Sequence, residues 1–210
     1  MNAVITMDVI SSRELFAEGY LKREFYRSAD RASEAMADSL ITRFSISRGD
    51  EIQGVIERPA DIPVIVRNLR YFFAPALLRI GVGVGEIDRL VASDNSWDMD
   101  GQAFHRAREA LDALGDIKMP STRVVTGHTD IDSTANVIYT LADAVESRWT
   151  VPQWQAVYAY ERYGTYRAAG EMLGVAGQNV AKRCKAARRS AVMEGEEYLT
   201  RLFENIGRDE

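Results

Sequence analysis

One segment, residues 78–84, constrains the fold more than any other part of this sequence. Aliphatic residues alternate there with Arg79, Gly81 and Gly83, and Gly85 follows directly. A period of two is typical of a β-strand whose two faces meet different surroundings. Glycine weakens a strand interior, so three glycines on one face require the close approach of a ligand or of another backbone, such as a tightly packed helix. The sequence leaves both alternatives open.

Apolar periodicity predicts that strands and helices alternate on both sides of this segment. The expected strands cover residues 2–7, 43–47, 52–56, 78–84 and 122–126. The expected helices cover residues 12–40, 61–73, 101–114 and 132–146. The first part of this order, βαββαβ, predicts an α+β, ferredoxin-like sheet with helices on one face and the other face open.

Charge divides the chain near residue 147. Residues 1–147 hold 16 Lys and Arg against 23 Asp and Glu, a net charge of −7, whereas residues 148–210 hold 10 against 8, a net charge of +2. We therefore expect an acidic α+β domain over 1–147 and a basic all-α domain over 148–210. This pattern favours contact between a polyanion and the second domain alone, although a solvated basic helix face has the same composition.

The basic domain has the order of a helix-turn-helix unit. Pro152 opens one helix that ends at Gly164, Thr165 caps a short second helix, and Gly174 turns the chain into a third helix over residues 176–189. In such a pair the last helix enters the DNA major groove by its N-terminal end. The candidate DNA-contacting residues are Thr165, Tyr166, Arg167, Gln178, Asn179, Lys182, Arg183 and Lys185.

The side chains of the third helix divide by chemistry. Gln178 and Asn179 have the amide geometry that reads adenine, and the basic residues after them are placed for phosphates. A helix pair that binds protein is the alternative. Residues 194–210 are expected to form an acidic amphipathic helix that either folds back on the body or pairs with a second copy in a homodimer.

Acidic residues are expected to meet at one edge of the sheet. Asp8 ends the first strand, and Asp50 and Glu51 lie in the hairpin turn that follows Gly49. Carboxylates that gather without a cation repel one another, and Mg²⁺ or Mn²⁺ takes oxygen ligands of this kind. The pattern therefore predicts a metal site formed by these three acids, while a capping aspartate and an ordinary turn explain each position separately.

The order of Asp8, residues 49–51 and residues 79–86 resembles the palm domain of class III nucleotide cyclases and diguanylate cyclases. The nucleotide-binding residues that this resemblance implies are Arg79, Gly81, Gly83, His105 and Arg108. His105 stands where the cyclases have an asparagine, and Arg108 is one residue early. The resemblance therefore implies metal or nucleotide binding more than cyclase chemistry.

The sequence blocks 7–13, 47–54, 79–86 and 103–111, together with Trp149-Thr150, resemble those of the SatD family in their order. This resemblance covers nearly the whole chain. It implies membership of a family and no particular activity.

Three classes of function follow from these observations. The first is a cytoplasmic DNA-binding protein, a transcriptional regulator whose palm-type domain senses a nucleoside triphosphate with Mg²⁺. The second is an enzyme, a metal-dependent nucleotidyltransferase or a nucleotide cyclase-like protein, and the third is a protein-binding adaptor. The single cysteine, Cys184, excludes an internal disulfide, and no apolar run approaches the ~20 residues that span a bilayer.

Overall fold

A five-stranded mixed sheet forms the centre of the protein, and its strand order is β2-β3-β1-β4-β5. The computed structural model describes residues 1–17, 22–47, 49–88 and 95–206. The strands are β1 (Asn2–Val9), β2 (Leu40–Ile46), β3 (Ile52–Ile56), β4 (Leu78–Gly85) and β5 (Ser121–Val125). Strand β1 pairs antiparallel with both β3 and β4, β2 pairs antiparallel with β3, and β5 runs parallel to β4.

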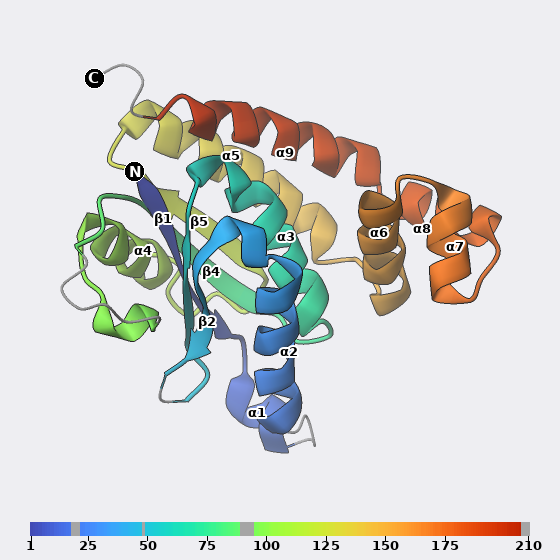
Figure 1. Cartoon of the computed structure of the whole chain (residues 1–210), viewed down its shortest axis with the longest axis horizontal. Coiled ribbons are helices and arrows are strands. Elements are labelled where there is room, and N and C mark those ends of the chain that lie inside the picture. The colour runs from blue at the N-terminus through green and yellow to red at the C-terminus, as the bar shows by residue number, and fades with distance from the viewer. Residues whose placement is uncertain (18–21, 48, 89–94, 207–210) are drawn as a thin grey trace.

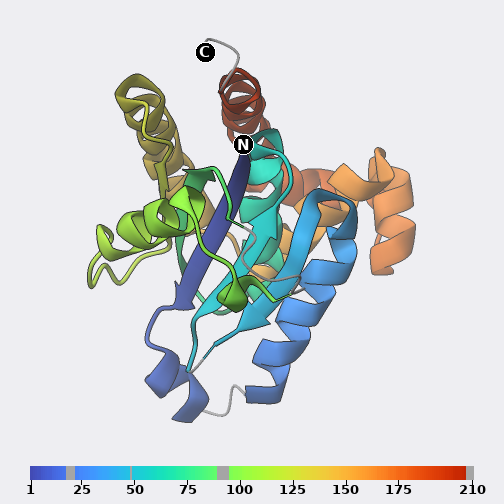
Figure 2. The ribbon, with the colours of Figure 1, turned by 60° about the vertical axis from the view of Figure 1, so that its left-hand side comes forward.

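Helices flank both faces of the sheet (Figures 1 and 2). They are α1 (Ser12–Ala17), α2 (Lys22–Ala35), α3 (Ile62–Phe73), α4 (Gln102–Asp112), α5 (Thr129–Glu146), α6 (Val151–Tyr163), α7 (Tyr166–Leu173), α8 (Gly177–Ala186) and α9 (Arg189–Glu204). Short 3-10 turns are η1 (Ala37–Ser39), η2 (Pro59–Asp61) and η3 (Ser96–Asp98). Helices α6 to α8 project from one end, whereas α9 runs back along the body (Figure 1). None of the described helices is both long enough and apolar enough for a membrane span.

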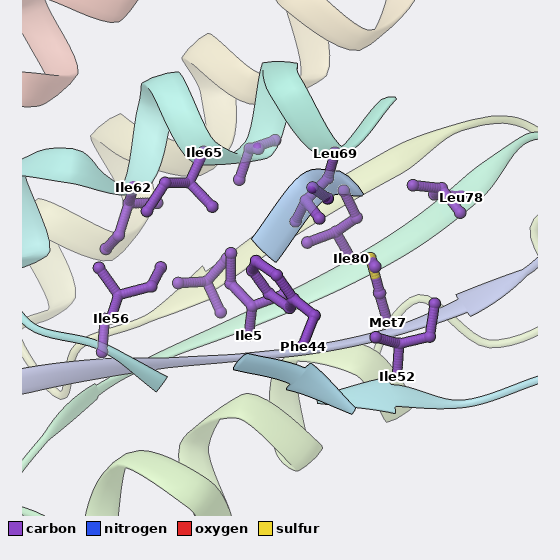
Figure 3. Packing of buried hydrophobic residues seen from close by; sticks show 14 of the residues in the cluster. Ile5, Met7, Phe44, Ile52, Ile56, Ile62, Ile65, Leu69, Leu78 and Ile80 are labelled. Carbon is purple, nitrogen blue, oxygen red and sulfur yellow. The ribbon is translucent and has the colours of Figure 1, made fainter. Parts of the chain in front are cut away.

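The main hydrophobic core lies between the sheet and helices α2 and α3. Alternate residues of the two central strands, such as Ile5 in β1 and Ile80 in β4, point toward Ile65 and Leu69 of α3 (Figure 3). All four side chains are almost completely buried. Burying a large aliphatic side chain stabilises a fold by about 1.5–3 kcal/mol, so this layer holds the sheet to α3.

The glycine face of β4 lies directly beneath α4. A Cβ atom at Gly83 would stand 2.1 Å from the carbonyl oxygen of Ala103, and one at Gly81 would stand 2.4 Å from that of Ala107. Of the two explanations that the sequence leaves open, the packed helix is the one found. The expectation of an open sheet face is therefore wrong over β4, because strand and helix backbones meet there without side chains between them.

Element boundaries differ from the predictions at several places. Strand β2 begins at Leu40, three residues before the predicted start, because Leu40 pairs with Ile56 of β3. Helix α5 begins three residues early, at Thr129. The predicted third helix of the basic domain ends sooner, at Ala186, because Arg188 adopts a left-handed conformation with φ 53° before α9 begins. Positions 18–21 of the predicted first helix and positions 207–210 of the last lie outside the described residues.

The C-terminal helices have a small core of their own and are joined to the body. Trp154, Val180 and other buried residues pack together among α6, α7, α8 and the start of α9. Tyr71 of α3 stacks on Tyr158 of α6, with ring centroids 4.1 Å apart. Phe203, near the end of α9, packs in the main core of the body. The sequence left two alternatives for this last helix, folding back on the body or pairing with a second copy. In this chain α9 folds back onto the body.

Candidate nucleic-acid interface

Helices α7 and α8 are joined by a three-residue turn. The backbone N–H of Ala168 donates to the Thr165 hydroxyl oxygen over 3.2 Å, which caps α7. Gly174 follows α7 in the left-handed region with φ 66°, a conformation that glycine adopts without strain. The N–H of Val175 then donates to the Gly170 carbonyl over 2.9 Å. The cap and turn lie at the residues that the sequence indicates, and they set the direction of α8.

Two glycines that the sequence analysis did not single out allow this turn to close. A Cβ atom at Gly170 would lie 2.6 Å from the Val175 carbonyl oxygen, and one at Gly177 would lie 2.9 Å from that of Tyr166. The turn and the start of α8 therefore rest directly on α7. A glycine inside a short amphipathic helix, four residues before the glycine of the turn, is the pattern that could have indicated this close contact.

Helix α8 presents a polar and basic face to solvent. Gln178, Asn179, Lys182 and Lys185 are exposed, and Arg183 is half-buried. Within the part of the chain that the structure describes, no ion pair or hydrogen bond engages the charged ends of Lys182, Arg183 or Lys185. These cations are therefore available to an external anion.

The acidic residues of the same region are paired with other arginines. Glu161 of α6 forms an ion pair with Arg189 of α9, and the guanidinium of Arg189 also lies 4.4 Å from the ring centroid of Tyr160. Glu171 pairs with Arg167 within α7, with 3.0 Å between Nε and Oε1. Both side chains of this second pair are largely exposed, so solvent weakens it and the pair opens readily. The exposed side of α8 consequently keeps its positive charge.

A second charged group of residues lies where β1 ends and β4 begins. Asp8 and Arg79 are direct partners across the two strands. Arg79 donates from Nε to Oδ1 over 2.8 Å and from Nη2 to Oδ2 over 2.5 Å, a bidentate contact. Arg79 also donates to the carbonyl of Gly115, just after α4. The hydrogen bonds to Asp8 raise the pKa of Arg79, although partial burial opposes the rise.

Glu51 and Arg108 form the second pair of this group. Arg108 extends from α4 and donates from Nη1 to Oε2 of Glu51 over 3.1 Å, with a second contact from Nη2 to Oε1. The hydrogen bonds to Glu51 raise the pKa of Arg108, and the charge of Asp8 adds to the effect. The charge of Asp50 contributes in the same way at Arg79. We call these five residues, Asp8, Asp50, Glu51, Arg79 and Arg108, the rim cluster.

The rim cluster brings the predicted acids and arginines to one region, but each carboxylate of the two pairs is bound by an arginine. Among the described residues, no group of three His, Cys, Asp or Glu side chains is close enough to hold a metal ion. In this arrangement arginines, and no gathered set of ligands, neutralise Asp8 and Glu51, and the metal site stays a prediction. His105 is 77 % exposed and contacts Asp100, with 3.2 Å between Nε2 and Oδ1. The glycines of β4 have no space for a ligand on their α4 side.

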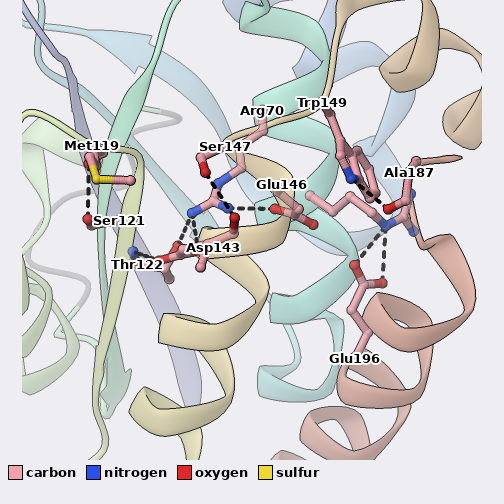
Figure 4. A network of polar contacts seen from close by, with 12 residues as sticks. Arg70, Met119, Ser121, Thr122, Asp143, Glu146, Ser147, Trp149, Ala187 and Glu196 are labelled. Carbon is pink, nitrogen blue, oxygen red and sulfur yellow. Dashed lines mark hydrogen bonds and ion pairs between the residues drawn. The ribbon is translucent and has the colours of Figure 1, made fainter.

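A buried network of charges lies between the body and the C-terminal helices (Figure 4). Arg70 of α3 donates from Nη1 to Glu146 and from Nη2 to Asp143, both over 2.5 Å. Burial raises the pKa of both carboxyl groups, against the attraction of Arg70. Arg67 holds Glu196 of α9 over 2.8 Å, and burial raises the pKa of Glu196 to about 8. Sequence reasoning missed this network, although Asp143 and Glu146 interrupt an otherwise apolar helix stripe.

Comparison with known proteins identifies one family. The SatD family model matches residues 2–190. No curated protein matches the sequence. Among solved structures, the crystal structure of a regulator of polyketide synthase expression from Bifidobacterium adolescentis is 15% identical in sequence to this chain. The match covers 99% of this chain and 80% of that chain, with a TM-score of 0.28. This likeness is too low to support an argument about function. Since the family model matches nearly the whole length, the chain belongs to the SatD family.

Proposed function

We propose that the protein binds DNA through α7 and α8, which act as a helix-turn-helix with α8 as the recognition helix. The observation that carries this proposal is the exposed face of α8, whose Lys182, Arg183 and Lys185 have no acidic partner among the described residues. Isolated cations on one helix face form the electrostatic footprint of a nucleic-acid site.

Each part of this surface has a separate role in the proposal. Gln178 and Asn179, in the first turn of α8, read base edges in the major groove. The three basic residues after them contact phosphates and give affinity that does not depend on sequence. Thr165, Tyr166 and Arg167 at the start of α7 contact the DNA backbone.

The acidic body supports a single mode of docking. Residues 1–147 carry a net charge of −7, so DNA is repelled from the sheet and directed to the basic helices. The stacked rings of Tyr71 and Tyr158 join α6 to the body. A change in the body can therefore shift α7 and α8, which is the coupling that a transcriptional regulator requires.

Fluorescence anisotropy with a labelled 30-base-pair duplex at several salt concentrations tests the proposal. Three phosphate contacts predict that log K falls with log salt with a slope of about −3 or steeper. Genomic fragments that bind more tightly than a random duplex would identify the target sequence. The adaptor alternative predicts no binding to any duplex even at low salt, and that result would overturn the proposal.

The rim cluster supports a second candidate function, nucleotide sensing by a ferredoxin-like, palm-type body. Arg79 and Arg108 offer two guanidinium groups for phosphates, and Asp8, Asp50 and Glu51 offer carboxylates for a divalent cation. In the free protein Asp8 neutralises Arg79 and Glu51 neutralises Arg108. A nucleoside triphosphate with Mg²⁺ or Mn²⁺ carries both complementary charges, so its binding requires the ion pairs to exchange partners.

Thermal unfolding with ATP or GTP and Mg²⁺ or Mn²⁺ tests this second candidate. Binding raises the melting temperature, and Asp8→Ala and Asp50→Ala abolish the rise, whereas Asp30→Ala, at an exposed residue outside the cluster, retains it. No shift with either triphosphate would reject the candidate. Incubation with labelled triphosphates and Mn²⁺ then separates a sensor from a nucleotidyltransferase or cyclase-like enzyme, because only an enzyme forms a new product.

A further inference from the structure

Two adjoining hollows, of about 420 and 410 Å³, form one groove along α5. Helix α9 forms the other wall of the first hollow, and the end of α8 with the link to α9 forms that of the second. Leu141 and Val145 of α5 line both hollows, so the two join at these residues. Helices α5 and α9 lie side by side along the groove (Figure 1).

The middle of this groove leaves apolar side chains in solvent. Leu141 is 65% exposed and Tyr198 is 48% exposed. Ala144 of α5 and Ala191 of α9 are exposed beside them. A contiguous apolar surface with polar residues around it is typical of a protein–protein interaction site. The groove is therefore a candidate interface, and its charges decide which partner fits.

The two hollows differ in charge. Glu194 lines the first hollow, whereas Arg148 and Arg188 line the second. All three side chains are exposed, and none of their charged groups forms an ion pair or a hydrogen bond with another described residue. A partner that matches this groove therefore has an apolar centre, a basic group opposite Glu194 and an acidic group opposite the two arginines.

We propose that the groove binds a second copy of this chain, related to the first by a two-fold axis that passes near Leu141 and Val145. In a two-fold dimer the same patch meets itself, so the axis places the first hollow of each copy against the second hollow of the other. Glu194 of each copy then meets Arg148 and Arg188 of the other, which is the complementarity that the groove requires. The shared apolar residues lie nearest the axis and form the centre of the interface.

The dimer has a consequence for DNA recognition, and this consequence rests on the proposed function. The second hollow includes Ala186, the last residue of α8, so the interface lies beside the recognition helix of each copy. A dimer of this kind presents two α8 helices to paired half-sites. Formation of the dimer requires no DNA, so a measurement of mass without DNA separates the two proposals. A dimer that binds no duplex rejects the proposed function alone, whereas a monomer that binds DNA rejects this inference alone.

Light scattering of the full chain at high micromolar concentration tests the dimer. The expected mass is twice the 23.5 kDa of one chain. Leu141→Lys places two ammonium groups near the axis and is expected to reduce self-affinity at least tenfold. Ile117→Lys is the matched control, because Ile117 is 46% exposed and lies outside the groove, and it is expected to leave self-affinity unchanged. A wild-type mass of one chain, or equal self-affinity of Leu141→Lys and wild type, would overturn the proposal.

Charge reversal tests the two-fold arrangement itself. Glu194→Arg makes the charged residues of both hollows basic, and the double variant Arg148→Glu, Arg188→Glu makes them acidic. Each of the two proteins alone is expected to lose at least tenfold in self-affinity, because like charges then face each other across the interface. An equimolar mixture is expected to form dimers again, since a basic groove meets an acidic one.

The three reversed residues are exposed, so each variant is expected to keep the fold of the single chain, which circular dichroism checks. Dimerisation of either charge variant alone with wild-type affinity would show that the copies pair elsewhere. A mixture of two folded variants that stays monomeric would contradict the exchange of hollows between the copies. Either result would overturn the proposal.

Discussion

The rim cluster and the exposed face of α8 contain similar side chains in opposite situations. At the rim, Arg79 and Arg108 are held by Asp8 and Glu51, and α4 lies on the strand beside them. On α8, the basic side chains extend into solvent without an acidic partner among the described residues. The comparison teaches that the pairing of a cation, more than its presence, decides whether it is free to bind a polyanion. In the free protein carboxylates engage the arginines of the rim cluster, whereas among the described residues no carboxylate engages the cations of α8.

A substitution on the glycine face of β4 is expected to have the largest effect on the free energy of unfolding. Gly83→Ala places a methyl group 2.1 Å from a carbonyl oxygen of α4, so we expect a loss of about 4 kcal/mol or more in unfolding free energy. Gly174→Ala is the control, because open space surrounds that exposed turn and only its positive φ opposes alanine. Chemical denaturation measures both variants. Gly83→Ala with the stability of wild type would mean that α4 does not rest on this strand.

Removal of the free cations of α8 is expected to have the next largest effect. The triple variant Lys182→Ala, Arg183→Ala, Lys185→Ala should lose about a hundredfold in DNA affinity, close to 3 kcal/mol, and its salt dependence should become shallower. The matched control removes three arginines of the body that are paired with acids, Arg27, Arg43 and Arg58. Equal losses in the two triple variants would break the distinction between paired and free cations.

Glu196 extends the comparison to a buried pair. Burial raises the pKa of Glu196 to about 8 from its usual 4.5, so between these pH values the folded state holds a proton that the unfolded state has released. Stability therefore falls as pH rises from about 4.5 to 8, and Glu196→Gln should remove most of that fall. Thermal or urea unfolding across this pH range measures the difference. Parallel pH profiles for the two proteins would contradict the raised pKa.

Removal of the Asp8–Arg79 ion pair is expected to have the smallest effect on stability. Asp8→Asn keeps the shape of the side chain but removes its charge from a bidentate contact that is about one-fifth exposed, so we expect a loss of about 1 kcal/mol. Asp30→Asn is the control, because its contact with Arg43 is 3.8 Å long and both side chains are mostly exposed. DNA affinity should be the same in both variants. A weaker DNA complex for Asp8→Asn would assign the rim cluster to the interface.

Much of the fold was predictable from local patterns. The strict alternation of β4 and the helical spacing of α3 each identify an element, because buried faces repeat at two or at three to four residues. The start of β2 was not predictable, since Leu40 suits a helix stripe as well as a strand and only its pairing with β3 decides. The reason for the β4 glycines was equally non-local, because α4 is distant in the sequence.

The candidate sites were predictable to different degrees. The cap at Thr165 and the turn at Gly174 are local features, so the sequence indicates them directly. The partners of Asp8 and Glu51 depend on strand register and on the approach of α4, so the sequence shows acids and arginines without showing which of them pair. A cavity of about 290 Å³ beside Trp149 is lined by three separate stretches of the chain, within residues 70–78, at 120 and within 146–154, and no sequence pattern indicates it.

Hydrogen–deuterium exchange with and without a saturating DNA duplex tests most directly the claim that α7 and α8, and not the rim cluster, meet DNA. We predict slower exchange in peptides that cover residues 165–186 and unchanged exchange in peptides that cover β4 and α4. Unchanged exchange over residues 165–186, together with protection of β4 and α4, would contradict the account.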